Sequence, residues 1–498
     1  MYKAPMSADP HDPPEIPWGS RIMRAIAWRS GSQVVAQLIM WMGTFFVIRI
    51  LDPRDYGLYA MTSSVLAFLT LLNGQEFAAS LVQAPTVTRH QIRQTFGLLI
   101  AMNGAMAALQ VAIAPLAAAY YGHPQVATML RVQALLYLST PLIAVPSALL
   151  SRELNYRTQA TVNLGSALIG AGVSLGLALG GAGVWTLVAA PICAFWTRAI
   201  GLTIAARMLV LPSFDFRGAG SVIRFGGAML LSSVFWLFQT QADVLIGGRL
   251  VSAHALGLYT EALFLTQIVT AKFVPPINDV TFSAYARMQH DRATTARAFE
   301  KSVRLIMMVA LPFYAGLAVT AEPFVLVVLG DKWGEMVPIV RLLACVMPLV
   351  TLQILFPPAA TALGQPRVQV LAAMLGAVLM PVAFWIGARA DGGIGMAWAW
   401  VVTSPLLVLF TAWLAIPVIG TSASALWRAC RPSLIAALGM AAGVMLLDRA
   451  IGGLLPAPRL IALVVTGVAL YGALTLALAR DVLREGAALI GKRVPRVA

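Results

Sequence analysis

Long apolar stretches separated by short polar ones run through most of the chain. A helix rises about 1.5 Å per residue, so about 20 apolar residues span the hydrocarbon core of a bilayer. Interior Gly and Pro are frequent in these stretches, as a membrane bundle allows, because neighbouring helices satisfy the freed backbone groups. The pattern predicts fourteen membrane-spanning helices, at about 31–51, 57–83, 94–117, 128–150, 158–180, 184–205, 226–250, 256–279, 303–329, 337–361, 369–388, 395–418, 432–451 and 459–479.

The composition agrees with this pattern. Hydrophobic residues make up 59% of the 498 residues and charged residues 11%, with a mean hydropathy of +0.81. Soluble domains carry about 25% charged residues, and a chain of this length would need enough charge to cover about three of them. The chain is therefore predicted to be an all-α polytopic membrane protein. Soluble enzymes, secreted disulfide scaffolds and free nucleic-acid binders are excluded.

The net charge of +15 indicates topology rather than a nucleic-acid partner. Most Lys and Arg fall on alternate loops and at the two ends of the chain, as expected for cytoplasmic segments. We therefore expect both termini to be cytoplasmic. Residues 1–30 are Pro-rich without an apolar core, which predicts a disordered tail rather than a cleaved signal peptide, and residues 480–498 form a basic cytoplasmic tail.

The polar segments offer little chemistry outside the membrane. No outer loop is longer than about a dozen residues, too short for a catalytic domain. The three cysteines are far apart, the five histidines are scattered, and the chain has no phosphate-binding GxxxxGK[ST] loop. We expect no metal, no cofactor and no enzymatic activity, so that the function lies within the bilayer.

An internal repeat divides the chain. RILDPRDYGLY at 49–59 and RLVSAHALGLY at 249–259 match at an offset of 200 residues, GAGVW at 181–185 resembles GIGMAW at 393–398, and Arg131 and Arg341 open equivalent spans. Two copies of six helices have the same orientation, with a pseudo-two-fold axis along the membrane normal and a site between them. We predict an N-lobe at 31–205, a linker at 206–225, a C-lobe at 226–418 and two extra helices at 432–479.

Several of these segments, in this order, carry a family resemblance. They are Arg49–Gly57 (RILDPRDYG), Asn73–Leu81 (NGQEFAASL), Ser151–Arg157 (SRELNYR), Gly183–Trp185 (GVW), Asp243–Arg249 (DVLIGGR) and Leu329–Trp333 (LGDKW). With them the chain resembles, over nearly its whole length, the polysaccharide-transport (Wzx-like) branch of the multidrug/oligosaccharidyl-lipid/polysaccharide flippase superfamily. Val280–Ser283 departs from the family pattern, in which a Pro often follows the aromatic residue.

The resemblance implies two six-helix lobes around a central cavity that opens alternately to each side. It also implies a flippase in the bacterial inner membrane that moves polyprenyl-pyrophosphate-linked oligosaccharides to the periplasmic leaflet, for exopolysaccharide, capsule or O-antigen (lipopolysaccharide) synthesis. Membrane lipids, a polysaccharide polymerase and export machinery are the implied partners. The alternatives are a cation-coupled multidrug exporter of the same superfamily and a membrane polysaccharide polymerase or ligase, which the short outer loops disfavour.

Ionisable residues inside the predicted spans are the candidate site. A charged side chain at the centre of a membrane helix raises the free energy of insertion by about 2.5–3.5 kcal/mol, so such residues usually have a function. Arg198 and Lys272 lie in the cytoplasmic third and Arg49 and Arg249 at the outer ends, and we expect all four to line the cavity and bind pyrophosphate. Snorkelling to lipid headgroups is the alternative, at the outer interface for Arg49 and Arg249 and at the inner interface for Arg198 and Lys272. The acidic candidates for ion coupling are Asp243, for which a structural counter-ion role is the alternative, and Glu261.

Overall fold

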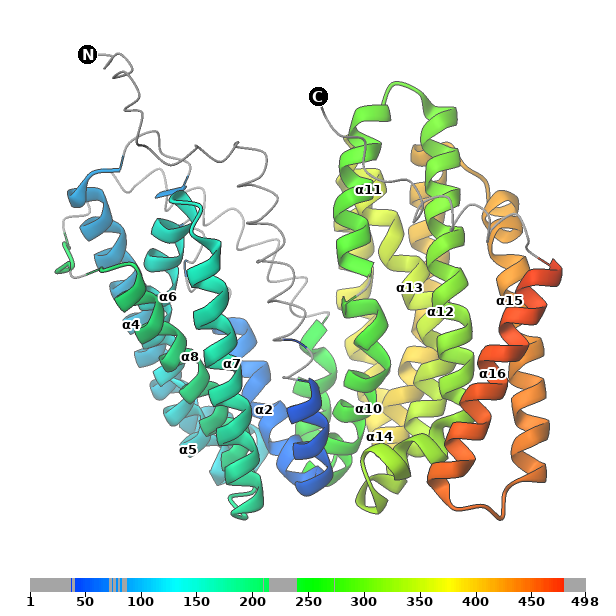
Figure 1. Cartoon of the computed structure of the whole chain (residues 1–498), viewed down its shortest axis with the longest axis horizontal. Helices are drawn as coiled ribbons and strands as arrows, with labels where there is room; N and C mark the ends of the chain where they lie inside the picture. Colours follow the sequence, from blue (N-terminus) through cyan, green and yellow to red (C-terminus); the bar gives the residue numbers. More distant parts are fainter. Residues whose placement is uncertain are drawn as a thin grey trace, which may run out of the picture. The chain divides into compact units, whose positions relative to one another are not determined.

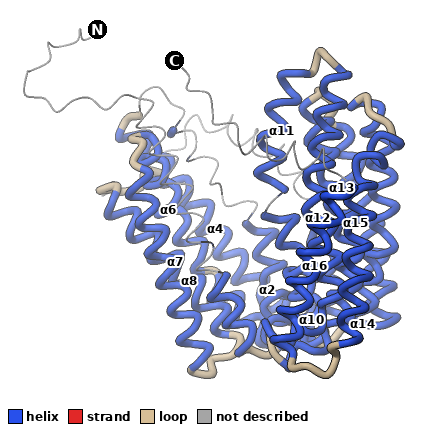
Figure 2. Tube along the Cα trace, turned by 45° about the vertical axis from the view of Figure 1, so that its right-hand side comes forward, coloured by secondary structure: helices blue, strands red, loops and turns tan. Residues whose placement is uncertain are grey.

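The regular elements of the chain are helices throughout the part that the computed structural model describes (Figures 1 and 2). That part comprises residues 41–70, 87–208, 210–214, 240–272 and 274–478, with residues 37, 74, 78, 81 and 82. The predicted N-terminal and C-terminal tails and most of the seventh predicted span lie outside it. The elements are helical segments Trp41–Ile50 and 240–250, and α2 (Pro53–Thr70), α4 (Arg89–Tyr121), α5 (Pro124–Gln133), α6 (Leu135–Arg152), α7 (Tyr156–Leu179), α8 (Trp185–Ala205), α10 (Ala253–Lys272), α11 (Val274–Met288), α12 (Arg292–Val328), the 3-10 helix η1 (Asp331–Met336), α13 (Val337–Ala362), α14 (Arg367–Ile419), α15 (Ala423–Ala450) and α16 (Pro456–Leu478).

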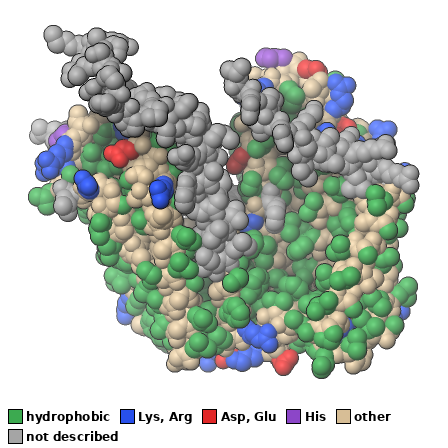
Figure 3. Space-filling view, viewed as in Figure 1, with side chains coloured by type: hydrophobic (Ala, Val, Ile, Leu, Met, Phe, Trp, Pro, Cys, Tyr) green, Lys and Arg blue, Asp and Glu red, His purple; other side chains and the backbone are tan. Residues whose placement is uncertain are grey.

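Nine helices of the described part are long and apolar enough to cross a membrane. The protein is therefore a multi-pass, all-helical membrane protein. Hydrophobic side chains cover the flanks of the helices, and charged side chains gather mainly near the helix ends (Figure 3). This is the distribution that a lipid environment requires, and the count of fourteen spans stays a prediction.

Helix α14 holds two of the predicted spans. Its 53 residues would extend about 80 Å if straight, far beyond the roughly 30 Å hydrocarbon core. The chain reverses at Asp391 and Gly392, where Gly392 has a φ of 53°. A Cβ added to Gly387 would overlap the carbonyl of Gly395, and the converse also holds. The two halves of α14 are therefore a tight antiparallel hairpin, as the predicted spans 369–388 and 395–418 require.

The chain packs as two compact units. The first comprises 1–47, 72–112 and 131–218, and its core includes Leu99, Val145 and Ala148, with α7 and α6 both packed on α8. The second comprises 48–71, 113–130 and 219–498. The second unit thus combines the C-terminal half of the chain with two segments of the first repeat. The lobes predicted at 31–205 and 226–418 follow the repeat, and those boundaries stay a prediction.

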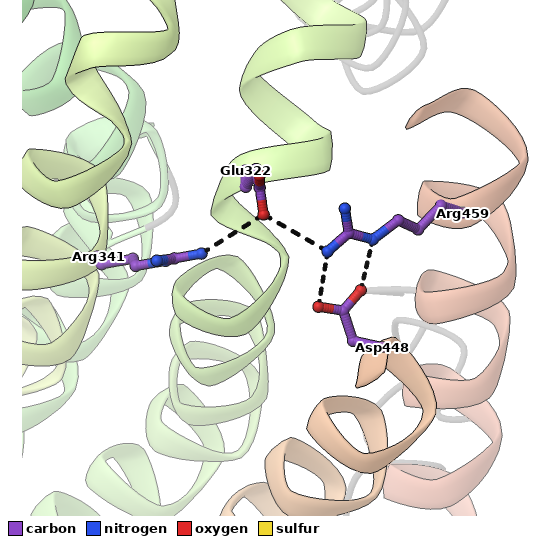
Figure 4. Close-up of polar contacts among 4 residues, drawn as sticks. All are labelled: Glu322, Arg341, Asp448 and Arg459. Atoms are coloured by element: carbon purple, nitrogen blue, oxygen red, sulfur yellow. Dashed lines mark hydrogen bonds and ion pairs between the residues drawn. The ribbon is translucent and has the colours of Figure 1, made fainter. Parts of the chain in front are cut away.

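Four charged side chains fasten the last two helices to the rest of the second unit (Figure 4). Arg459 of α16 donates two hydrogen bonds to Asp448 of α15, at 2.7 and 2.9 Å. The same guanidinium group lies 3.4 Å from Glu322 of α12, which also pairs with Arg341 of α13 at 3.9 Å. This cluster joins α15 and α16 to α12 and α13 at one end of the bundle.

We expect Arg459→Gln to loosen this end of the bundle. Arg459 and Asp448 are only 15% and 22% exposed, so losing the bidentate pair leaves a poorly solvated carboxylate and should cost about 1–3 kcal/mol. The measurement is the melting temperature of the purified protein in detergent. Arg341→Gln is the control: its ion pair is about half exposed and should contribute about 1 kcal/mol or less. Equal losses in both variants would contradict the assignment.

Candidate functional site

The two copies of the repeated motif meet each other in the second unit. Helices α2 and α10 lie side by side (Figures 1 and 2) and pack closely. A Cβ added to Gly57 would overlap the carbonyl of Ala253, and one added to Gly257 would overlap the carbonyl of Pro53. Gly57 and Gly257 are equivalent positions of the repeat. Only glycine lets two helix backbones approach this closely, which explains why both copies of the motif carry it.

Two arginines make reciprocal hydrogen bonds next to this glycine contact. Arg49, in the last turn of segment Trp41–Ile50, donates from Nη1 to the carbonyl of Val327, 2.6 Å away in the last turn of α12. Arg249, in the last turn of segment 240–250, donates to the carbonyl of Tyr120, 2.8 Å away in the last turn of α4. The last carbonyls of a helix lack intrahelical partners and favour a cation. Each arginine therefore caps a helix of the other repeat.

Two aromatic side chains repeat the same reciprocity. Trp333 is fully buried and donates from Nε1 to the carbonyl of Ile48, at 2.9 Å, with its ring edge-on to Tyr56. Tyr120 donates from its hydroxyl to the carbonyl of Leu245, at 3.1 Å. Trp333 follows the third helix of the second repeat, and Tyr120 lies at the end of the third helix of the first repeat. Each of them binds the first helix of the other repeat. Sequence reasoning did not single out these aromatic residues as site residues, although Trp333 belongs to the quoted LGDKW segment.

We call this set of contacts the outer seal: Arg49, Gly57, Tyr120, Arg249, Gly257, Val327 and Trp333, with the residues that they touch. It lies at the helix ends that the predicted topology assigns to the periplasm. An ion pair between Lys332 and Asp52 at 3.0 Å lies beside it, and both side chains are more than half exposed. All of these residues belong to the second unit.

A buried polar chain lies next to the outer seal. The Asp243 carboxylate is 4% exposed and accepts a hydrogen bond from the Tyr259 hydroxyl at 3.1 Å. Tyr259, fully buried, in turn accepts one from Nε1 of Trp400 at 2.8 Å. No cation pairs with Asp243 within the described ranges. The described partners of the carboxylate are therefore neutral: the Tyr259 hydroxyl on one oxygen and the backbone N–H of Val244 on the other, at 2.8 Å.

Glu261 lies two residues after Tyr259 on α10. Its side chain is half-buried and within electrostatic range of Tyr56 and Tyr59 of α2. Neither a hydrogen bond nor an ion pair holds it among the residues that the structure describes. The two acidic candidates thus occupy different surroundings: Asp243 is held in a polar chain, and Glu261 lies beside two phenol rings.

The two deep cations occupy separate units. Arg198 lies in α8 of the first unit, and its Nε atom is buried without a hydrogen-bond partner in the described part of the chain. Lys272 ends α10 in the second unit and has an exposed side chain. Pro275 and Pro276 follow it in α11. Neither cation has an acidic partner within the described residues.

A helical membrane protein whose internal repeats meet through reciprocal contacts has the architecture of a repeat-built transporter. Residues 46–338, more than half of the chain, match the family model described as "Polysaccharide biosynthesis protein". The chain belongs to this family, the Wzx-like flippases of the multidrug/oligosaccharidyl-lipid/polysaccharide flippase superfamily. It is a polysaccharide biosynthesis transport protein and not an enzyme.

Relatives match along almost the whole chain. The succinoglycan biosynthesis transport protein ExoT of Rhizobium meliloti is 27% identical over 487 residues, covering 96% of this chain and 97% of its own. The teichuronic acid biosynthesis protein TuaB of Bacillus subtilis is 23% identical, with 85% and 88% covered. The structure of the lipid II flippase MurJ in an inward closed conformation superposes with a TM-score of 0.63 at 14% identity, covering 94% and 98%. The last likeness shows the fold.

These matches confirm three predictions from the sequence: the family, the all-helical multi-pass membrane architecture, and the assignment as a transporter. They place the chain in the polysaccharide branch of the superfamily rather than the multidrug branch. The lipid carrier, the direction of transport and the residues that contact the substrate stay predictions.

Proposed function

We propose that the protein flips polyprenyl-pyrophosphate-linked oligosaccharide units from the cytoplasmic to the periplasmic leaflet of a bacterial inner membrane. The observation that carries the proposal is the end-to-end match with a succinoglycan biosynthesis transport protein. A polymer subunit that is assembled on a lipid inside the cell has a large polar head, which needs an aqueous path through the bilayer. Alternating access between two repeats supplies such a path.

Arg198 and Lys272 carry the proposed contact with pyrophosphate. A cation at their depth is costly in lipid, and such residues usually face a bundle interior or a water-filled cavity. The buried Nε of Arg198 has no hydrogen-bond partner in the described part of the chain, and the exposed ammonium of Lys272 has no ion-pair partner there. An anion would therefore not have to displace a described protein partner from either nitrogen. The planar guanidinium group of Arg198 suits the paired oxygens of a phosphate group.

Arg49 and Arg249 differ from Arg198 and Lys272 because the protein already occupies their guanidinium groups. Their guanidinium groups already donate to the carbonyls of Val327 and Tyr120, so a pyrophosphate would have to displace these bonds. We therefore assign the first contact with substrate to the deep cations and give the outer pair a role in the outer seal. A polar head that passes outward would meet Arg49 and Arg249 last.

Asp243 is our candidate for coupling transport to an ion gradient. A buried carboxylate that has a hydroxyl rather than a cation as its partner can take up a proton without leaving another charge unpaired. It lies beside the outer seal, where opening would expose it to the outside. Glu261 is the second candidate, because it lies at the same end of α10.

The Asp243→Asn variant separates coupling from structure. Asn keeps an acceptor for the Tyr259 hydroxyl, although its NH2 group replaces the oxygen that accepts from the Val244 N–H. Asn does not titrate, so the contact with Tyr259 should survive and coupling should fail. Coupling free energies of about 1–3 kcal/mol correspond to ~5–150-fold, and we expect transport to fall by a factor in this range. The measurement is the initial rate of transport at a fixed proton or sodium gradient. Tyr259→Phe is the matched variant, which removes the hydrogen bond but keeps the carboxylate. Full transport in Asp243→Asn would contradict the coupling role.

Genetic complementation tests the proposed function. Deletion of the gene should abolish the surface polysaccharide and leave lipid-linked oligosaccharide on the cytoplasmic leaflet, and the intact gene should restore export. Loss of polymer without retention of the lipid-linked precursor inside would contradict the proposal, because it would place the defect before or after the flipping step. The lipid-linked precursor is measured in the membrane fraction. After flipping, a polymerase and export machinery would act on it.

A further inference from the structure

We propose that Arg49 and Arg249 form a two-sided latch that holds the outer side of the transporter closed, and that both hydrogen bonds break together when it opens outward. The inference deepens the proposed alternating access, on which it rests. It concerns the state of the outer seal rather than the identity of the substrate.

The first support is where the bonds lead. Arg49 belongs to the first helix of the first repeat, and its acceptor Val327 ends the third helix of the second repeat. Arg249 and its acceptor Tyr120 have the converse relation. Each bond thus joins the two repeats, whose outer ends must separate if the cavity opens outward. A bond that only stabilised one repeat would not have this pattern.

The second support is that the bonds suit reversible release. Both arginine side chains are exposed, and the acceptors are terminal helix carbonyls that water can satisfy after release. Opening therefore strands neither a buried charge nor a buried carbonyl. A snorkelling arginine would instead reach for headgroups, whereas donor–acceptor distances of 2.6 and 2.8 Å show that each guanidinium group is held by protein.

The third support is the two-fold relation itself. The same pairing recurs for Gly57 and Gly257 and for the hydroxyl of Tyr120 and the indole of Trp333. Contacts related by one axis change together when the two repeats rotate about it. Lys332 also joins the two repeats, through Asp52 and the carbonyl of Ile50, but its side chain is more than half exposed and surface pairs contribute little. The latch therefore assigns the two arginines as the charged groups of this two-fold set.

A buried reporter cysteine tests the latch without any substrate. Met61 is fully buried, one turn inside Gly57. A Met61→Cys protein without the native cysteines is reconstituted into proteoliposomes with its periplasmic side facing outward. A charged, membrane-impermeant methanethiosulfonate reagent is then added outside. Arg49→Ala and Arg249→Ala should each raise the labelling rate about threefold to tenfold, the factor for about 0.6–1.4 kcal/mol. In the double variant the two factors should multiply, because both bonds break in one step.

Controls fix the interpretation. Arg341→Ala removes an outer arginine that pairs with Glu322 instead of a carbonyl, and it should leave labelling unchanged. Arg49→Lys and Arg249→Lys keep the charge and an N–H donor but lose the longer, planar guanidinium group. Their labelling should fall between that of the parent and that of the alanine variants. Unchanged labelling in the double alanine variant, or an equal rise in Arg341→Ala, would overturn the latch. Increased labelling together with a failure to move lipid-linked oligosaccharide would leave the latch standing and overturn the proposed substrate.

Discussion

A Gly57→Ala variant is expected to lose most transport, and Gly257→Ala is expected to match it. The added Cβ would overlap the backbone carbonyl of Ala253 or Pro53, respectively, and a helix backbone has no rotamer with which to yield. Helices α2 and α10 would have to move apart. Overpacking of this kind costs about 1–3 kcal/mol, which corresponds to a shift of ~5–150-fold against the closed outer side.

Matched glycines provide the control. A Cβ added to Gly104 of α4 or Gly172 of α7 meets open space, so Gly104→Ala and Gly172→Ala should transport as the parent does. Export is scored by surface polysaccharide in a deletion strain, with protein abundance measured in the same membranes. If Gly57→Ala were as active as Gly104→Ala at equal abundance, close packing of the repeated motif would not matter for transport.

The second large effect is expected at the deep cations. Arg198→Glu and Lys272→Glu should each reduce export below detection, because a carboxylate would repel the pyrophosphate that we expect these residues to attract. The corresponding alanine variants should retain more activity, since they remove attraction without adding repulsion. Arg198→Lys should keep part of the rate, because the charge remains while the bidentate fork is lost.

The comparison for these variants is Arg428→Glu, which reverses an exposed cation of α15 away from both deep cations in the sequence. It should export normally at normal abundance. Full export by both Arg198→Glu and Lys272→Glu would show that these side chains only reach the inner membrane interface and do not contact substrate.

Hydrophobicity alone predicted most of the membrane-crossing helices but not where they end. The structure extends α12 to Arg292, eleven residues before the predicted start at 303, because Asp291 accepts a hydrogen bond from the backbone N–H of Thr294 and starts the helix in water. Hydrogen bonds from Thr294 also lower the pKa of Asp291. A hydropathy window detects only the helical residues that lie in the hydrocarbon core. It does not detect a polar extension of the same helix.

The eighth predicted span shows a second limit. The sequence predicted this helix to end at 279, whereas helical structure continues to Met288 at the end of α11. Tyr285 in this extension is buried and donates a hydrogen bond from its hydroxyl to Ser302 of α12. Contacts with α12 of this kind are invisible to a search for apolar length.

The candidate site shows what a repeat can and cannot reveal. The offset of 200 residues marked Arg49 and Arg249 as equivalent, and in the structure they make equivalent bonds. Their acceptors lie 278 and 129 residues away, and no local pattern identifies a backbone carbonyl as a partner. The Tyr259 partner of Asp243 and its link to Trp400 escaped notice for the same reason.

Reconstitution tests the central claim most directly. The purified full-length protein is placed in liposomes that contain a polyprenyl-pyrophosphate-linked oligosaccharide with a fluorophore on the sugar, and dithionite, which does not cross the membrane, is added outside. We predict that wild-type protein exposes the inner pool of label to dithionite much faster than Arg198→Glu does at equal protein density. Retention of the inner pool at the rate of protein-free liposomes, with wild-type protein correctly folded in the membrane, would contradict the account.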